Sequence, residues 1–321
     1  MPNMLLVVVA DPAAPYLAHL SHMPQNVQMV VTDDLEHLKK IVPQAEAILY
    51  ASLSPVLVQI LPLAERVRWI HVLWTGVDGL LTPEMLEHPS ILTNGRGVFS
   101  GPLADWVVAA MLFFAFDFGR LIRQQGQRVW QPFISSTLEG RTLGILGYGS
   151  IGSAVAARAR PFGMKIAALR RRPELFQGDS LVDQNYGPSQ LKELITASDY
   201  FLVSTPLTAA TRGMIGEREI ALIKPDGVLI NIGRGPVIDE DALVRALETH
   251  RIRGAALDVF KTEPLPPDHP LWRMPNVLLS PHTADRVDGF LVPPFGCFFK
   301  NLDRFMRGQQ LLHVVDKHAG Y

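Results

Sequence analysis

A glycine-rich stretch, GYGSIG at residues 147–152, limits the possible folds of this chain more than any other feature. It directly follows an apolar run, TLGIL, and precedes a segment with helical character, SAVAARARPF. Glycines in the pattern G-x-G-x-x-G between a strand and a helix are typical of the first crossover of a Rossmann sheet, where the loop binds the pyrophosphate of a dinucleotide. Because glycines also occur in ordinary turns, the prediction of a cofactor site depends on this strand-turn-helix context.

Each glycine of the motif has a separate predicted role. Gly147 permits a tight turn, Gly149 lets the backbone approach the pyrophosphate, and Gly152 lets the helix pack closely on the strand. At Ser150 and Ile151 the start of the helix supplies free N–H groups and the positive end of its dipole, both of which favour phosphate binding.

Short apolar runs alternate with helical segments along the chain and predict parallel α/β sheets. The first hundred residues contain five such runs, at 4–9, 27–31, 46–51, 68–73 and 91–93. A second series of six matches the strand count of a doubly wound dinucleotide-binding sheet, with runs at 142–146, 164–169, 199–204, 227–232, 254–259 and 276–280. The segment 101–124 is apolar nearly all round and predicts one long helix, either deeply buried or part of a subunit interface.

Composition excludes several classes of protein and partner. With 48% hydrophobic residues, 19% charged residues and a formal net charge of −1, the chain is expected to be globular and soluble, without bulk attraction to nucleic acid or an anionic membrane. No apolar run has the length of a membrane span, and the N-terminal run is too short for a signal sequence, so the expected location is cytoplasmic. Cys297 is the only cysteine and is expected to pack as a small apolar residue. No His, Asp or Cys cluster has ligand spacing, so no metal is expected.

Three arginines, Arg170, Arg171 and Arg172, follow the second strand of the later series. NAD sites usually have an acid at this position, which accepts a hydrogen bond from the ribose 2′-hydroxyl. A guanidinium cannot accept a hydrogen bond but binds phosphate well, so the sequence predicts NADP(H) as the preferred cofactor, held by Arg170 or Arg171. The alternative is a solvated basic turn, and Arg172 is the arginine that fits this alternative best.

Three polar residues follow successive strands of the same series: Arg234 after the fourth, Glu263 after the fifth and His282 after the sixth. Ligands of open α/β sheets bind outside the carboxyl ends of the strands, so we expect these residues to share one site. Each residue taken singly is more often an exposed loop residue. Independent surface residues, however, have no reason to lie at three successive strand ends.

The chemistry of these three residues fits the reduction of a 2-keto acid by a hydride from the cofactor. His282, with an ordinary pKa of about 6.5, can protonate the developing alkoxide. Glu263 can orient the imidazole and favour its protonated form. Arg234 can bind the substrate carboxylate and stabilise the charge that forms on the reacting oxygen.

Eight motifs extend the pattern over nearly the whole chain: WTGVDGL, NGRGVFSGPLADWV, GRTLGILGYGSIG, STPLT, INIGRGPVIDEDAL, AALDVFKTEPLP, SPHTA and HVVDKHAGY. Together they resemble the D-isomer-specific 2-hydroxyacid dehydrogenase family. The family's catalytic Arg, Glu and His fall on Arg234, Glu263 and His282, in agreement with the roles assigned from chemistry.

The resemblance implies an α/β fold with two doubly wound domains. A Rossmann dinucleotide-binding domain at 100–284 would be inserted in a flavodoxin-like substrate domain made of 1–99 and 285–321. Members of the family are usually homodimers through the nucleotide-binding domain, so the same assembly is expected of this chain.

The resemblance also adds site residues. It implies that Gly76 and Val77 bind the substrate carboxylate through backbone N–H groups, and that Thr205 and Pro206 contact the cofactor. Asp258 matches an acid near the nicotinamide carboxamide. Trp74, just before the carboxylate loop, is left open between a place in the substrate pocket and a place in the core.

The predicted function is an NADPH-preferring reductase of small 2-keto acids, of the glyoxylate and hydroxypyruvate type, that forms the D-2-hydroxy acid. NAD(H) is the alternative cofactor. Other functions on the same fold are a nucleotide-sensing scaffold or corepressor, a phosphoglycerate dehydrogenase, and a phosphite or formate dehydrogenase.

Overall fold

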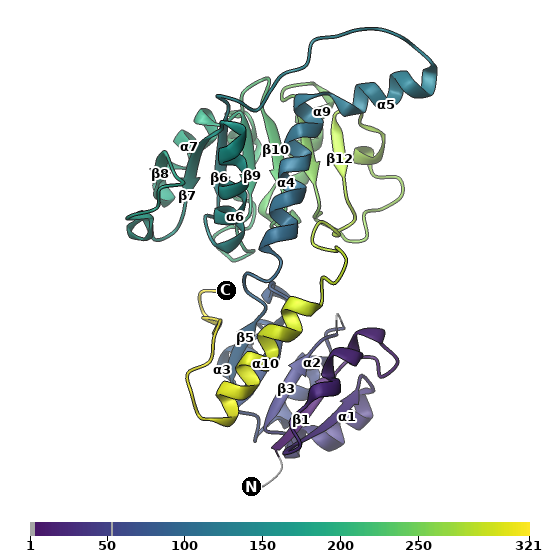
Figure 1. The fold of residues 1–321 in the computed structure, drawn as a ribbon, viewed down its shortest axis with the longest axis vertical. Helices are drawn as coiled ribbons and strands as arrows, with labels where there is room; N and C mark the ends of the chain where they lie inside the picture. Colours follow the sequence, from purple (N-terminus) through teal and green to yellow (C-terminus); the bar gives the residue numbers. More distant parts are fainter. Residues whose placement is uncertain (1–3, 53) are drawn as a thin grey trace. The chain divides into compact units, whose positions relative to one another are not determined.

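The computed structural model describes residues 4–52 and 54–321, and the chain divides into two compact units. One unit comprises Met1–Phe99 and Asp288–Tyr321, and the other comprises Ser100–Val287 (Figure 1). The chain thus returns to the first unit at Asp288, where the sequence placed the boundary at residue 285. The first unit is built from both ends of the chain, and the second unit is the insertion.

The first unit contains a five-stranded parallel sheet in the order β2-β1-β3-β4-β5. This is the strand order of flavodoxin-like folds. Three strands, β1, β3 and β4, are buried almost along their whole length, as expected for a parallel sheet with helices on both faces. The strands are β1 Met4–Val9, β2 Val27–Thr32, β3 Ala47–Tyr50, β4 Trp69–Val72 and β5 Ile91–Asn94.

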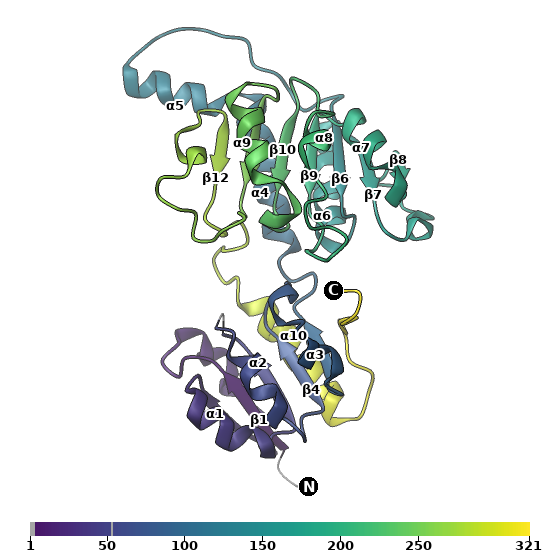
Figure 2. The same cartoon turned by 180° about the vertical axis from the view of Figure 1, so that it is seen from behind.

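Helices cover both faces of this sheet (Figures 1 and 2). One face packs against α1 (Leu35–Ile41), α2 (Val56–Ile60) and α3 (Pro83–Glu87). The other face packs against the 3-10 helix Pro15–His22 and against α10 (Val292–Met306), near the end of the chain. The Trp69 ring of β4 stacks on Phe298 of α10 with 5.6 Å between ring centroids, so the C-terminal segment completes the core of the N-terminal sheet.

The second unit contains a seven-stranded parallel sheet in the order β12-β11-β10-β9-β6-β7-β8. Counted from β6, the order is that of a Rossmann sheet with one more strand at its edge, which confirms the predicted fold class. The strands are β6 Thr142–Leu146, β7 Lys165–Leu169, β8 Gln184–Tyr186, β9 Tyr200–Val203, β10 Val228–Asn231, β11 Gly254–Leu257 and β12 Val277–Leu279. The sequence reading missed β8, because its residues, QNY, are polar and largely exposed at the sheet edge.

Helices also cover both faces of the second sheet (Figures 1 and 2). One face packs against α7 (Leu191–Ala197), α8 (Glu217–Ile220) and α9 (Glu240–Glu248), whose apolar residues join one large core cluster. The opposite face is covered by α4 (Ser100–Ala115) and α6 (Ser150–Ala159).

The predicted long helix at 101–124 is wrong as a single element. The structure has two helices, α4 and α5 (Phe118–Gln127), which meet at an angle of 61°. Asp117 lies between them in the left-handed region with φ of 51°, and its side chain accepts a hydrogen bond from Arg120 N at 3.3 Å. The short acidic side chain both tolerates this backbone conformation and caps the next helix, so the chain turns where apolar periodicity alone predicts continuation.

Exposed apolar residues are concentrated after this bend. α5 buries none of its side chains, and in the extended segment that follows, Trp130 is 96% exposed and Ile134 is 99% exposed. Among the described residues, no single helix has the length and apolar character needed to cross a membrane; α4 and α5 reach both only when the bent pair is counted together.

Candidate active site

The glycine turn joins β6 to α6 in the geometry that the motif predicts. Gly147 has φ of 99°, and a Cβ there would lie 2.7 Å from the backbone nitrogen of Thr205. A Cβ on Gly152 would lie 2.8 Å from the carbonyl oxygen of Gly147, so this glycine lets α6 pack against the turn. A Cβ on Gly149, in contrast, would have no atom within 4 Å apart from those of Gly149 and its two chain neighbours. The turn is closely packed at its first and third glycines and open at the second, which fits a pyrophosphate beside Gly149.

The first turn of α6 is suited to an anion. Its N-cap is Gly149, which has no side chain to accept a hydrogen bond from the following N–H groups. The N–H groups at Ser150 and Ile151 therefore have no capping side chain, and the helix dipole adds positive potential at the same point. Thr205 and Pro206 follow β9, and the buried Thr205 packs its backbone against Gly147, beside the turn.

Arg170 is placed next to the glycine turn. Its Nη1 donates a hydrogen bond to the carbonyl oxygen of Leu175 at 3.0 Å. Its guanidinium carbon lies 5.3 Å from the centre of the Phe176 ring and 6.0 Å from that of Tyr148, which is part of the glycine motif. The cation is thus held where the end of β7 meets the glycine motif, a position from which a guanidinium can bind a phosphate. Arg171 is exposed at the same strand end.

Arg234 follows β10, and a buried asparagine fixes its backbone. Asn231, which is 1% exposed, accepts a hydrogen bond from Gly233 N at 3.0 Å and donates one to the carbonyl oxygen of Arg234 at 3.2 Å. The Arg234 side chain donates to the carbonyl oxygen of Gly233 at 2.8 Å. The turn that carries Arg234 is therefore held by hydrogen bonds from the side chain of a buried strand residue.

Glu263 and His282 are brought into direct contact by the loops after β11 and β12. Glu263 Oε2 lies 2.7 Å from His282 Nδ1, and Glu263 Oε1 accepts a hydrogen bond from Phe260 N at 2.9 Å. A Cβ on Gly235 would lie 1.9 Å from the carbonyl carbon of Phe260, so the Glu263 loop rests directly on the backbone next to Arg234. The structure thus brings the three predicted residues together at the carboxyl ends of neighbouring strands.

The charges of these residues act on one another. The hydrogen bond to Glu263 raises the pKa of His282 above its ordinary value of 6.5, against the opposing effects of burial and of the Arg234 charge. Burial opposes ionisation of Glu263, but hydrogen bonds from His282 and Phe260 N, with the charges of His282 and Arg234, hold its pKa below the usual value. Both directions favour an imidazolium paired with a carboxylate, an arrangement that can supply a proton.

Asp258, at the end of β11, organises the loop that carries His282. It is 2% exposed, and its Oδ1 accepts hydrogen bonds from Ser280 Oγ, from Thr283 N at 2.9 Å and from Ala284 N at 3.1 Å. The backbone nitrogen of His282 donates to the carbonyl oxygen of Asp258 at 3.0 Å. These bonds hold His282 in the left-handed region, with φ of 53°, which is uncommon for a residue other than glycine. Burial raises the pKa of Asp258.

Gly76 and Val77 lie in the first unit, in the loop that follows β4. This loop is tied to the segment after β5, since Gly95 N donates to the carbonyl oxygen of Trp74 at 3.0 Å and Thr75 Oγ1 donates to the carbonyl oxygen of Gly95 at 2.9 Å. The Trp74 ring packs against both hydrophobic clusters of this unit. The two alternatives for Trp74 were a place in the substrate pocket and a place in the core. The structure shows contacts between Trp74 and the core.

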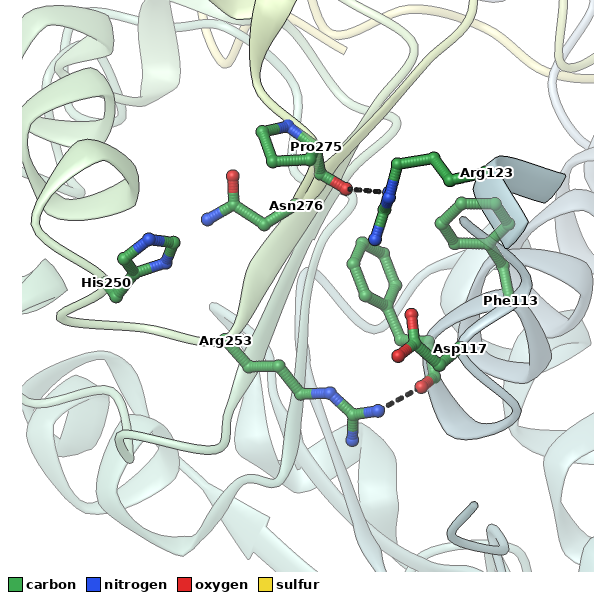
Figure 3. Close-up of a pocket in the computed structure, with 8 residues that line it drawn as sticks. Phe113, Asp117, Arg123, His250, Arg253, Pro275 and Asn276 are labelled. Atoms are coloured by element: carbon green, nitrogen blue, oxygen red, sulfur yellow. Dashed lines mark hydrogen bonds between the residues drawn. The ribbon is translucent and has the colours of Figure 1, made fainter. Parts of the chain in front are cut away.

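A cavity of about 250 Å³ lies elsewhere in the second unit (Figure 3). His250 and Arg253 precede β11, and Pro275 and Asn276 precede β12, so the cavity lies at the amino ends of these strands. Glu263 and His282 follow the carboxyl ends of the same strands. The cavity is lined by Phe113, Phe114, Asp117, Arg123, His250, Arg253, Pro275 and Asn276, and it does not include the predicted site residues.

Sequence reasoning missed three residues that support the site: Asn231, Ser280 and Glu240. Asn231 is a buried polar residue at the end of a predicted strand, a signal that could have identified it. Ser280 ends the last strand run beside His282. Glu240 gave no local signal, because it contacts a loop twenty-one residues further along the chain.

The fold, the glycine turn and the polar residues at the strand ends define a dinucleotide-binding α/β protein with the geometry of an oxidoreductase. Residues 108–284 match the model of the family described as "D-isomer specific 2-hydroxyacid dehydrogenase, NAD binding domain". Glyoxylate reductase of Korarchaeum cryptofilum (strain OPF8) is 34% identical over 287 residues, which cover 87% of this chain and 85% of that protein.

Two further comparisons agree. Glyoxylate/hydroxypyruvate reductase B of Pectobacterium carotovorum subsp. carotovorum (strain PC1) is 36% identical over 256 residues, covering 77% of this chain and 78% of that protein. The crystal structure of a D-isomer specific 2-hydroxyacid dehydrogenase from Xanthobacter autotrophicus Py2, in complex with NADPH and MES, has a TM-score of 0.84 and 25% identity and covers 100% of both chains. The chain belongs to the D-isomer specific 2-hydroxyacid dehydrogenase family, whose members are NAD(P)-dependent enzymes.

Proposed function

We propose that this enzyme reduces a small 2-keto acid to the D-2-hydroxy acid with NADPH, and that His282 is the proton donor. The observation that carries the proposal is the 2.7 Å contact between Glu263 Oε2 and His282 Nδ1. A carboxylate that accepts from Nδ1 fixes the ring orientation and leaves Nε2 to donate to a substrate oxygen. The reduced nicotinamide, when bound, supplies the hydride to the carbonyl carbon.

Arg234 has two proposed roles in this reaction. Its guanidinium can bind the substrate carboxylate in a planar fork, and its charge stabilises the oxygen that becomes negative before it is protonated by His282. Gly76 and Val77 are proposed to bind the substrate carboxylate through backbone N–H groups. Because these two residues belong to the first unit, we propose that this unit is the substrate domain.

The proposed preference for NADPH rests on Arg170 and Arg171. The hydrogen bond from Arg170 to Leu175 and its contact with the Phe176 ring place a cation beside the glycine turn. The residue at this strand end is Arg170 and not an acid that could accept from a ribose 2′-hydroxyl, so NADH lacks that contact with this residue. The complex of the Xanthobacter relative with NADPH supports the same preference.

A substrate panel tests the function. The purified enzyme is assayed by NADPH oxidation with glyoxylate, hydroxypyruvate, pyruvate and a bulkier 2-keto acid, each also with NADH, and the configuration of the product is determined. We expect the highest kcat/KM for glyoxylate or hydroxypyruvate with NADPH, in line with the names of the curated relatives. Absence of turnover with every 2-keto acid, in an enzyme that binds NADPH, would refute the proposal and favour a nucleotide-sensing role.

We further propose a homodimer that buries the exposed apolar residues of the second unit. α5 has no buried residue, and Ile122, Trp130 and Ile134 are 63%, 96% and 99% exposed. Monomeric proteins rarely expose such a concentration of large apolar side chains. Light scattering is expected to give a molecular mass twice that of the chain. The double variant Trp130→Ser, Ile134→Ser is expected to have a lower mass in solution, because it weakens the interface. A monomeric wild-type protein would contradict the proposal.

A further inference from the structure

Glu240, at the start of α9, binds the loop that carries Glu263 at two separate points. Its side chain is 12% exposed. Its Oε2 accepts a hydrogen bond from the backbone nitrogen of Lys261 at 2.9 Å. Its Oε1 lies 3.4 Å from Nε2 of His269, whose side chain is 18% exposed. Glu263 lies between these two points in the sequence, so one partly buried carboxylate holds the loop on both sides of it.

The contact with His269 does not require a charged imidazole. His269 Nδ1 accepts a hydrogen bond from Leu271 N at 3.4 Å, at the start of the 3-10 helix Pro270–Arg273. A neutral imidazole that accepts at Nδ1 carries its proton on Nε2, which is the nitrogen that faces Glu240. The contact therefore places the Nε2–H of a neutral His269 ring toward the Glu240 carboxylate, with 3.4 Å between Nε2 and Oε1.

The contacts of Glu240 with Lys261 and His269 form a clamp on the loop. This clamp is connected through neighbouring residues to the proposed acid–base pair. Lys261, held by Glu240, is the next residue after Phe260, whose backbone nitrogen donates to Glu263 Oε1 at 2.9 Å. The other oxygen of Glu263 lies 2.7 Å from His282 Nδ1. A shift of the Lys261 peptide would therefore move the group that orients the Glu263 carboxylate, and with it the carboxylate that orients His282.

We propose that Glu240 is a positioning residue for the Glu263–His282 pair. It does not touch the reacting atoms; it acts by holding the loop backbone at Lys261 and at His269. This inference rests on the proposed function, in which His282 donates the proton.

The neighbouring residue provides a matched control. Asp241 lies in the same first turn of α9, and its carboxylate contacts the same residue of the loop, but through the Lys261 side chain, with 3.5 Å between Oδ2 and Nζ. Both partners are exposed, at 73% and 59%. An exposed pair of this kind contributes little, while the charge of either residue is equally favourable near the helix N-terminus. Asp241→Asn therefore reproduces the loss of helix charge without releasing the loop backbone.

The test compares Glu240→Ala, Glu240→Gln and Asp241→Asn with the wild-type enzyme. For Glu240→Ala we expect kcat with NADPH and the best 2-keto acid to fall about tenfold to a hundredfold, the range expected when a catalytic group is displaced by up to an ångström. NADPH binding and the unfolding temperature should stay close to those of Asp241→Asn. Glu240→Gln retains an acceptor for Lys261 N, so its kcat should lie between those of Glu240→Ala and the wild type.

A second readout does not depend on turnover. The ring Cε1–H resonance of His282, assigned by its loss in His282→Gln, is titrated in each variant with NADP⁺ bound. Glu263, Arg234 and Asp258 are the charged groups that act on this imidazole. Since Glu263 is the group that raises its pKa, we expect the midpoint to fall in Glu240→Ala and to stay unchanged in Asp241→Asn. Glu263→Gln serves as the reference for complete loss of the pair.

The outcomes separate the two proposals. Wild-type kcat and a wild-type His282 titration in Glu240→Ala and Glu240→Gln would overturn the positioning role, even if Glu263→Gln shows both effects. If Glu263→Gln and His282→Gln leave turnover unchanged, the proposed function fails instead. Should Glu240→Ala not fold, Glu240→Gln decides the inference, because its side chain has nearly the same size but cannot pair with His269 as a carboxylate does. Wild-type kcat with a wild-type His282 titration in Glu240→Gln would then overturn the positioning role.

Discussion

Substituting Gly149 tests the cofactor site with a single methyl group. Apart from Gly149 and its two chain neighbours, the structure has no atom within 4 Å of a Cβ at this position, and the φ of −106° lies in a region open to alanine. The variant Gly149→Ala should therefore fold, at a cost of about 1 kcal/mol or less for a poorer N-cap residue. If the pyrophosphate lies against Gly149, however, the methyl group occupies the same space. The pyrophosphate is then displaced from the N–H groups of Ser150 and Ile151.

The expected loss of affinity follows from those hydrogen bonds. A hydrogen bond to a charged group contributes about 1.5–3 kcal/mol, so the loss of one raises the Kd for NADPH about 10- to 150-fold. Fluorescence titration of NADPH measures the Kd, and thermal unfolding without cofactor measures stability.

Gly152→Ala is the contrasting variant. Its Cβ would lie 2.8 Å from the backbone oxygen of Gly147, so the turn itself has to move. Overpacking of this kind costs about 1–3 kcal/mol, and the unfolding temperature is expected to drop without cofactor. A wild-type Kd for NADPH in Gly149→Ala would refute the assignment of the open position in the turn to the pyrophosphate.

The proposed acid–base pair and the arginines give three further predictions. His282→Gln is expected to lower kcat about 10²- to 10⁴-fold while NADPH still binds by fluorescence titration; unchanged turnover would exclude His282 as the donor. Because reduction needs the protonated imidazole, kcat/KM should fall as pH rises through a pKa above 6.5, and the fall should begin at lower pH in Glu263→Gln; superimposable pH profiles would argue against the pair. Arg170→Asp combined with Arg171→Ala should shift the ratio of kcat/KM toward NADH, with Arg172→Ala as the control, and an unshifted ratio would place the 2′-phosphate elsewhere.

The fold could be predicted from sequence because buried parallel strands are continuous apolar runs. All eleven predicted strand runs correspond to strands, and their ends agree to within two residues. The failures occurred where a helix cap or the pairing of an edge strand outweighs the apolar pattern. At Asp117 a left-handed backbone and a capping carboxylate end one helix and start another, and β8 forms as an exposed edge strand from three polar residues.

The candidate site was predictable for a different reason. Arg234, Glu263 and His282 each follow a strand of one parallel sheet, and topology brings the carboxyl ends of such strands to one edge. The contacts that support these three residues do not follow from strand topology in this way. The clamp from Glu240 to Lys261 and His269 depends on which loop crosses the start of α9, and that is set by tertiary packing.

The contacts between loops show how the cofactor turn and the strand-end residues come to share one edge. A Cβ on Gly147 would collide with the backbone of Thr205, and a Cβ on Gly233 would lie 2.7 Å from the oxygen of the same residue. Thr205 therefore fits between the glycine turn and the turn that carries Arg234. Gly235, on the other side of Arg234, lets the Phe260 backbone pack closely in the same way. These contacts are between backbones, so they do not depend on side-chain rotamers. The positions of the cofactor turn, Arg234 and the Glu263 loop are therefore set by the packing of four strand ends and not by side-chain conformation.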